Sequence, residues 1–118
     1  MVTAAITTGD GDTRVTLAGE LDVSTAPTLR AVLVEATDPR PDRVVIDLSD
    51  VTYLDSTGLG VLVGAHRRAV AYGGALAFIC PAGRVRHLFE LTGMSGVFTL
   101  YESAPADRWA DAPFRGMR

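Results

Sequence analysis

Ser56 is the residue in this sequence that is best placed to take part in chemistry. A short polar stretch separates it from an apolar segment at residues 43–48, and a segment with helical periodicity follows it at residues 57–71. A serine at a helix start has its hydroxyl group near unpaired backbone N–H groups and the positive end of the helix dipole. A phosphate group on Ser56 would therefore be tolerated. A serine that only caps the helix fits the same position.

Asp22 and Asp55 are acidic residues beside two predicted helix starts. Aspartate is common in turns and helix caps, so a purely structural role is open for both residues. A phosphate charge about 5 Å from a carboxylate is repelled by roughly 3 kcal/mol at an effective dielectric near 20, before solvent screening reduces the repulsion. Asp22 and Asp55 would therefore add to the effect of a phosphate on a binding partner.

A strand, a turn, a serine and a helix also resemble the nucleophile elbow of hydrolases. The sequence around Ser56 is Leu-Asp-Ser-Thr-Gly, which lacks the first glycine of the G-x-S-x-G motif. His66 and His87 fall within predicted helices and form no zinc-type spacing with the single cysteine, Cys80, for which core packing is expected. We therefore expect no enzyme activity, no metal and no cofactor.

The apolar patterns predict the order strand, strand, helix, strand, helix, strand, helix, strand. The first two strands are expected to pair antiparallel, and the run at residues 43–48, apolar on both faces, to be central and parallel. This order predicts a single α/β domain with a mixed, mostly parallel β-sheet of about five strands packed with three or more helices. The strands are expected at residues 4–7, 14–19, 43–48, 75–80 and 97–101, and the helices at 26–36, at 57–71 and before Gly93.

The predicted domain covers residues 1–102. Residues 103–118 show no clear periodicity and are expected to form a flexible tail or a short helix around Trp109, which would dock on the domain.

The helix at residues 57–71 is the expected docking face for a partner. Gly60 and Gly64 permit close backbone approach, Val61 offers apolar contact, and Arg67 and Arg68 are able to pair with acidic groups. The full set of residues expected to contact a partner is Asp22, Thr25, Asp55, Ser56, Thr57, Gly58, Gly60, Val61, Gly64, Arg67 and Arg68.

The composition excludes several classes of protein. A net charge of -3 argues against direct nucleic-acid binding, which needs a basic surface. The residues Arg84, Arg86 and His87 are interpreted as a solvated helix face. The sequence has neither a signal-peptide pattern nor about 18 consecutive apolar residues, so we expect a soluble, cytoplasmic protein without membrane insertion.

Two motifs resemble those of the STAS family of bacterial anti-anti-sigma factors. They are Gly-Glu-Leu-Asp at residues 19–22 and Asp-Ser-Thr-Gly-Leu-Gly at residues 55–60, and the predicted order of elements agrees from about residue 3 to 101. The resemblance implies that Ser56 is phosphorylated by an anti-sigma factor with serine kinase activity and restored by a phosphatase. It implies that the unphosphorylated protein binds this anti-sigma factor and releases a sigma factor.

One alternative stays open at this point, namely a STAS module that serves as a scaffold subunit of a stress-signalling or lipid-transport complex. For either role we expect phosphorylation to act at the binding interface while the fold stays intact.

Overall fold

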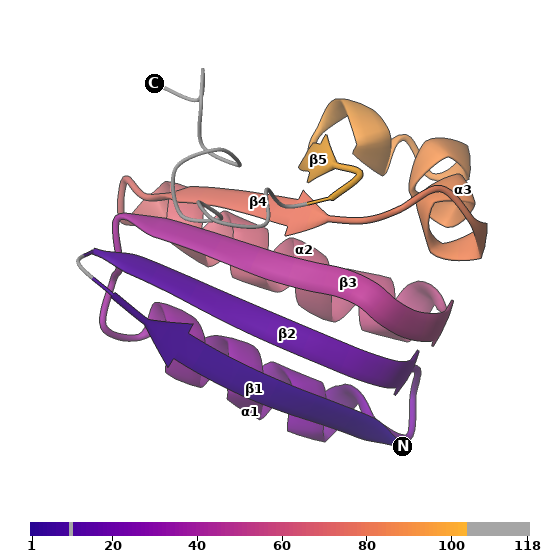
Figure 1. Cartoon of the computed structure of the whole chain (residues 1–118), viewed down its shortest axis with the longest axis horizontal. Helices are drawn as coiled ribbons and strands as arrows, with labels where there is room; N and C mark the ends of the chain where they lie inside the picture. The colour runs from indigo at the N-terminus through magenta and orange to yellow at the C-terminus, as the bar shows by residue number, and fades with distance from the viewer. Residues whose placement is uncertain (10, 104–118) are drawn as a thin grey trace.

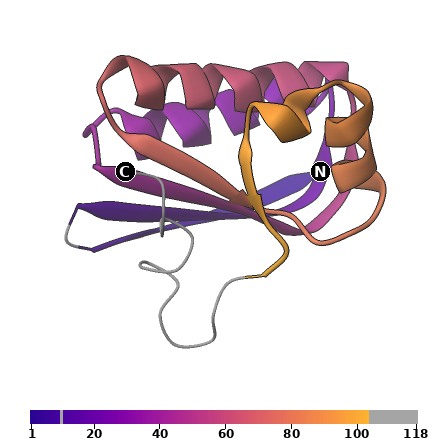
Figure 2. The ribbon, with the colours of Figure 1, turned by 90° about the horizontal axis from the view of Figure 1, so that it is seen from above.

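A computed structural model shows a single sheet with two long helices on one of its faces (Figure 1; Figure 2). The structure describes residues 1–9 and 11–103. Its five strands lie in sequence order, with β1 antiparallel to β2 and all other neighbours parallel. The predicted fold class is confirmed. The elements are β1 (Val2–Thr8), β2 (Asp12–Leu21), α1 (Ala26–Thr37), β3 (Arg43–Leu54), α2 (Ser56–Ala71), β4 (Ala75–Ile79), α3 (Arg84–Leu91), the 3-10 helix η1 (Met94–Gly96) and β5 (Thr99–Tyr101).

The main core lies between the sheet and the helices α1 and α2. Alternate residues of β2 point into it, among them Val15 and Leu17, because successive side chains of a strand face opposite sides of a sheet. Leu29 of α1 and Leu62 of α2 are fully buried against them. The position of each helix on the sheet is therefore fixed by the apolar face that the sequence predicted.

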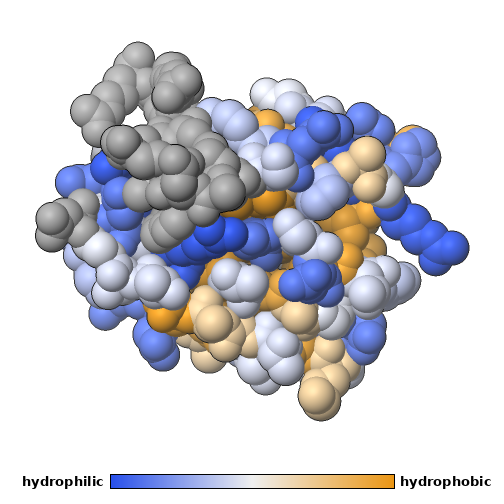
Figure 3. Space-filling model, viewed as in Figure 1, coloured by the Kyte–Doolittle hydropathy of each residue, from blue (hydrophilic) through white to orange (hydrophobic). Residues whose placement is uncertain are grey.

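A smaller apolar cluster lies on the opposite face of the sheet. Val45, Ala77 and Ile79 form it, and the ion pair between Arg14 and Asp47, with an N–O distance of 2.6 Å, involves side chains of β2 and β3. Figure 3 views this side of the molecule and shows hydrophobic and hydrophilic surface side by side. The burial of β3 on both faces confirms its predicted central position.

β3 is longer than expected, because it continues to Leu54 instead of ending near residue 48. Its pairing with β2 shifts register twice, between Thr16 and Ala18 and between Gly19 and Glu20, and then continues. Because of these irregularities, β3 continues through the polar residues that read as a loop in the sequence. As a result β2 and β3 end at the same level, with Leu21 paired to Leu54.

The C-terminal part differs in smaller ways. Gly93 has a φ of 77° and ends α3 as predicted, but η1 delays the last strand, which begins at Thr99 instead of residue 97. The predictions for the tail, Trp109 included, fall on residues 104–118 and lie outside the described residues. No helix in the described part is long and apolar enough to cross a membrane.

Cys80 follows β4 and belongs to the main core, with 1% of its surface exposed. Burial raises the pKa of its thiol to about 11, because the thiolate is disfavoured away from water. The expected packing role of Cys80 is confirmed.

Candidate functional site

The ends of β2 and β3 bring the two predicted acidic segments together at the edge of the sheet where α1 and α2 begin (Figure 1). The backbone N–H group of Asp55 donates a hydrogen bond to the carbonyl oxygen of Leu21 at 3.1 Å. Gly58 is buried, and a Cβ atom at its position would collide with the same Leu21 carbonyl. The start of α2 therefore packs directly against the end of β2, and only glycine fits there.

Asp55 is the N-cap residue of α2. Its backbone is extended, with a φ of -107°, and its Oδ1 atom accepts a hydrogen bond from the Gly58 N–H group at 2.9 Å. Its carbonyl oxygen accepts the first helical hydrogen bond, from Leu59, at 2.9 Å. This geometry confirms the capping interpretation of Asp55 and rules out the capping interpretation of Ser56, since the cap is the preceding residue.

Ser56 is the first residue of α2, and its side chain is exposed. Within the described chain its hydroxyl group makes no hydrogen bond, and the same holds for the exposed Thr57 that follows. The first backbone N–H groups of a helix have no helical acceptor, and the dipole favours negative charge there. The site is therefore accessible to an enzyme that adds a phosphate and suited to holding the phosphate afterwards.

The start of α1 is built differently. The Oδ1 atom of Asp22 accepts hydrogen bonds from the Ser24 hydroxyl at 2.7 Å and from the N–H groups of Ser24 and Thr25 at 3.0 and 3.1 Å. The pKa of Asp22 is lowered chiefly by the Ser24 hydroxyl group; desolvation, the next-largest cause, opposes this shift, and the Thr25 and Ser24 N–H groups add to it. The turn interpretation of Asp22 is thus confirmed, and its carboxylate is ionised at neutral pH.

Thr25 is mostly internal, with 7% of its surface exposed. Its hydroxyl oxygen accepts a hydrogen bond from the Asp22 N–H group at 2.9 Å and donates to the Glu20 carbonyl at 2.9 Å. The Thr25 hydroxyl therefore holds the turn together and offers little to a partner.

Two of the residues predicted on the docking face of α2 have open surroundings. Gly60 is exposed, and a Cβ atom there would meet nothing within 4 Å. At Gly64 a Cβ atom would meet only Arg68 Nη1, at 3.7 Å. Arg67 is exposed as well. This strip of α2 permits the close backbone approach that its glycines predicted.

One expectation for α2 is corrected. Val61, expected to offer apolar contact to a partner, is 5% exposed and packs in the main core. The reason is that α2 contacts both the sheet and α1, which widens its buried face on the side of Val61. Arg68 also turns toward α1, where its Nε atom donates to Thr37 Oγ1 at 3.2 Å.

The sequence reading missed an apolar surface beside Ser56. Tyr53 and Leu91 are 51% and 71% exposed and line a shallow cavity of about 240 Å³ between the end of β3 and α3. Val23, after β2, is also 71% exposed. Tyr53 was missed because residues 49–54 read as a loop, and because their buried residues, Val51 and Leu54, are three positions apart instead of alternating as in a regular strand.

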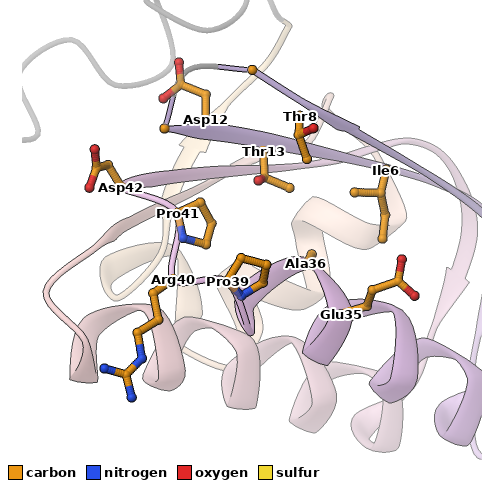
Figure 4. A pocket seen from close by; sticks show the side chains of 12 residues that line it. Ile6, Thr8, Asp12, Thr13, Glu35, Ala36, Pro39, Arg40, Pro41 and Asp42 are labelled. Carbon is orange, nitrogen blue, oxygen red and sulfur yellow. The ribbon is translucent and has the colours of Figure 1, made fainter.

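Figure 4 shows another cavity, of about 590 Å³, near the turn between β1 and β2. Its lining includes Ile6, Thr13 and Glu35. It lies at the end of the sheet where Asp12 pairs with Arg43, whereas the candidate site lies at the other end, where Leu21 pairs with Leu54. The described residues contain no cluster of three or more histidine, cysteine or acidic side chains that is able to hold a metal ion.

Comparison with known proteins gives concordant matches. The STAS domain matches residues 3–105. The anti-sigma-B factor antagonist of Bacillus subtilis (strain 168) is 40% identical over 91 residues, which cover 77% of this chain and 83% of the relative. The protein of the same name from Staphylococcus aureus (strain NCTC 8325 / PS 47) is 33% identical over 101 residues, covering 86% of this chain and 94% of that protein.

Solved structures show the same fold. The crystal structure of an anti-sigma factor antagonist from Mycobacterium paratuberculosis has a TM-score of 0.76 at 32% identity and covers 87% of each chain. The phosphorylated form of the Bacillus cell fate determinant SpoIIAA has a TM-score of 0.66 at 19% identity, over 86% of this chain and 93% of SpoIIAA, and supports the fold alone. The chain therefore belongs to the STAS domain family.

Proposed function

We propose that this protein is an anti-sigma factor antagonist that phosphorylation of Ser56 switches off. Its relatives from Bacillus subtilis and Staphylococcus aureus carry the name anti-sigma-B factor antagonist. In this proposal the unphosphorylated protein binds an anti-sigma factor in the cytoplasm, and the sigma factor is released. The protein acts by binding and not by catalysis, and it contacts no nucleic acid.

The observation that carries the proposal is the hydroxyl group of Ser56 at the first position of α2, which makes no hydrogen bond to any described residue. Asp55 already caps the helix, so among the described residues Ser56 has no structural task that a phosphate would disturb. Thr57 shares this exposure, but Ser56 occupies the position of the acceptor serine in the family motif that the sequence resembles. Ser56 is therefore the proposed acceptor and Thr57 its natural control.

The switch would act through charge at the interface. A phosphate adds nearly two negative charges at pH 7, and it would lie at the edge of the sheet that also carries the Asp22 and Asp55 carboxylates. A partner that covers Ser56 must desolvate this charge, and each loss of about 1.4 kcal/mol weakens binding tenfold. Because the Ser56 side chain is exposed, the fold itself would be unaffected.

The proposed docking surface combines the open strip of α2 with the apolar surface beside it. Gly60 and Gly64 let a partner approach the helix backbone, and Arg67 is available to pair with an acidic group. Tyr53 and Leu91 would supply the buried apolar contacts in place of Val61. The partner is an anti-sigma factor with serine kinase activity, and a phosphatase restores the active form.

Phosphorylation by such a partner tests the proposal. The purified protein would be incubated with ATP and the candidate anti-sigma kinases of its own organism, followed by intact mass measurement and site mapping. We expect one phosphate on the wild type and on the Thr57→Ala and Ser24→Ala variants, and none on Ser56→Ala. Phosphate on Thr57, or no kinase that binds or modifies the chain, would contradict the proposed switch and leave the fold assignment intact.

A further inference from the structure

The face of the sheet opposite α1 and α2 carries a buried apolar cluster of Val45, Ala77 and Ile79, the sheet-face cluster. Val45 and Ala77 are 0% exposed, and Ile79 is 1% exposed. The hydrophobic residues packed against them, Ala75 and Tyr101, also belong to strands. Helices α1 and α2 lie on the other face (Figure 2), and the buried residues of α3 belong to the main core. No helix in the described part of the chain therefore covers this cluster.

Two alanines on this face show that the burial is local. Ala18 of β2 and Ala77 of β4 each occupy a strand next to an edge strand of the sheet. Both side chains point away from the main core, because their chain neighbours Leu17, Leu76 and Phe78 belong to it. Ala18 is half-buried, as expected for a sheet face in contact with water, whereas Ala77 has no exposed surface. The flanking strands alone therefore do not account for the burial of Ala77.

The ion pairs beside the sheet-face cluster are shielded as well. Arg14 binds Asp47 with an N–O distance of 2.6 Å, and Arg43 binds Asp12 at 2.5 Å. The side chains of Arg14 and Arg43 are only 24% and 22% exposed, although an arginine on an open sheet face is long enough to reach water. The layer over the cluster therefore extends across β2 and β3.

The chain leaves the sheet at this cluster. Tyr101, the last residue of β5, packs against it, and the Tyr101 carbonyl oxygen accepts a hydrogen bond from the Cys80 N–H group at 2.7 Å. Residues 104–118 follow after Glu102 and Ser103. Adjacent strands lie about 4.8 Å apart, so β3 is about 10 Å from β5, a distance that about three extended residues span. The segment is thus long enough to cross the cluster.

We propose that residues 104–118 of this chain dock on the sheet-face cluster and cover it. The segment contains three large apolar residues, Trp109, Phe114 and Met117, which suit a buried apolar surface. Its three arginines and two aspartates carry charges of both signs, as the ion pairs beside the cluster do, so no repulsion between like charges as a whole opposes docking. Docking would withdraw an apolar sheet face from contact with other proteins. The inference does not depend on the phosphorylation of Ser56.

Trp109 reports the docking, because it is the single tryptophan of the chain. In the full chain we expect acrylamide to quench its fluorescence several-fold less than that of N-acetyl-tryptophanamide. The Ala77→Lys variant places a charged side chain in the cluster and should raise the quenching toward that of the free analogue. Ala18→Lys adds the same charge to the same face outside the cluster and should be quenched as the wild type is. Quenching of the wild type as strong as that of the analogue, or equal quenching in both variants, would overturn the proposal.

NMR of the unmutated, isotope-labelled chain tests the same contact if Ala77→Lys unfolds. We expect NOEs between the indole protons of Trp109 and the methyl groups of Val45 and Ile79. The absence of these NOEs, or NOEs from Trp109 to another surface of the domain, would contradict the docking. NOEs that arise only between differently labelled chains in a mixed sample would mean that the segment covers a second copy, and would also overturn the proposal. None of these outcomes affects the phosphorylation of Ser56.

Discussion

The starts of α1 and α2 both lie at the carboxyl ends of strands in the sheet. They are built from the same residue types but differ in the hydrogen bonding of their hydroxyl groups. Each follows a parallel strand and uses an aspartate carboxylate to satisfy backbone N–H groups. At α1 the hydroxyl groups of Ser24 and Thr25 are both hydrogen-bonded. At α2 the hydroxyl group of Ser56 makes no hydrogen bond within the described chain. The type of residue at a helix start therefore does not decide whether a hydroxyl group there is engaged in a hydrogen bond, whereas the identity of the capping group does.

The difference follows from the distance between strand and helix. After β2 a turn separates Leu21 from α1, and the side chains of Ser24 and Thr25 fold back to hold that turn. After β3 only Asp55 separates Leu54 from α2, so no turn is present to engage Ser56. A direct entry from strand into helix thus presents the first helical side chain to solvent.

The largest effect should come from the glycine that makes this direct entry possible. Gly58→Ala places a methyl group against the Leu21 carbonyl and should destabilise the fold by about 1–3 kcal/mol. Gly60→Ala has open space and should stabilise the helix by about 0.5–1 kcal/mol. Urea unfolding of both variants measures the two values. Equal effects at the two positions would contradict the close packing of α2 on β2.

The next-largest effect on stability should come from the loss of the Asp55 cap. Asp55→Ala should lower the free energy of unfolding by about 1 kcal/mol, because the Gly58 N–H group loses its acceptor. Ser56→Ala removes an exposed group that makes no hydrogen bond to residues 1–9 or 11–103, and it should change the free energy of unfolding by less than about 0.5 kcal/mol. Denaturant unfolding of both variants distinguishes them, and a larger loss for Ser56→Ala would show that the serine is the cap.

A negative charge introduced at each helix start should change the stability of the fold in opposite directions. Ser56→Glu places a carboxylate at the positive end of α2 and should stabilise the fold by about 0.3–1 kcal/mol at low salt. Ser24→Glu removes a hydroxyl donor to Asp22 and adds a like charge beside it, so it should destabilise. Thermal unfolding at low and high salt checks both signs. If Ser24→Glu stabilised the fold, the proposed difference between the two helix starts would be wrong.

The smallest effect concerns the titration of Asp22. Its pKa is lowered in the folded protein, chiefly by the Ser24 hydroxyl group, so its contribution to stability is present above the unfolded value of 3.8 and is lost as the pH falls through the folded value. Ser24→Ala should move the pKa of Asp22 upward, whereas Ser56→Ala should leave it unchanged. Carboxyl chemical shifts followed by NMR measure both, and an unmoved pKa in Ser24→Ala would exclude the hydroxyl as its cause.

Periodicity alone predicted the order of the elements and the antiparallel start of the sheet. The alternation around Val15 and the apolar run at residues 43–48 depend on local sequence, which is why β2 and β3 were found. The extension of β3 to Leu54 was not predictable in this way. It depends on register shifts against β2, which involve residues more than thirty positions away.

The candidate site was predictable in its location but not in its hydrogen bonds. Asp55, Ser56 and Thr57 are all residue types that cap helices, so the sequence left the choice among them open. The Leu21 carbonyl determines which of the three residues is the cap, because this carbonyl fixes the Asp55 N–H group and the position of Gly58. Val61 was misassigned because its burial arises from the packing of α2 against α1 and the sheet together.

The buried thiol of Cys80 has a practical consequence for following the proposed switch in solution. With a pKa of about 11 and 1% exposure, it should react very slowly with maleimide reagents at neutral pH. It is also the single cysteine of the chain. A cysteine introduced at an exposed position such as Val97 would therefore take up a fluorescent label selectively, without removal of the native thiol.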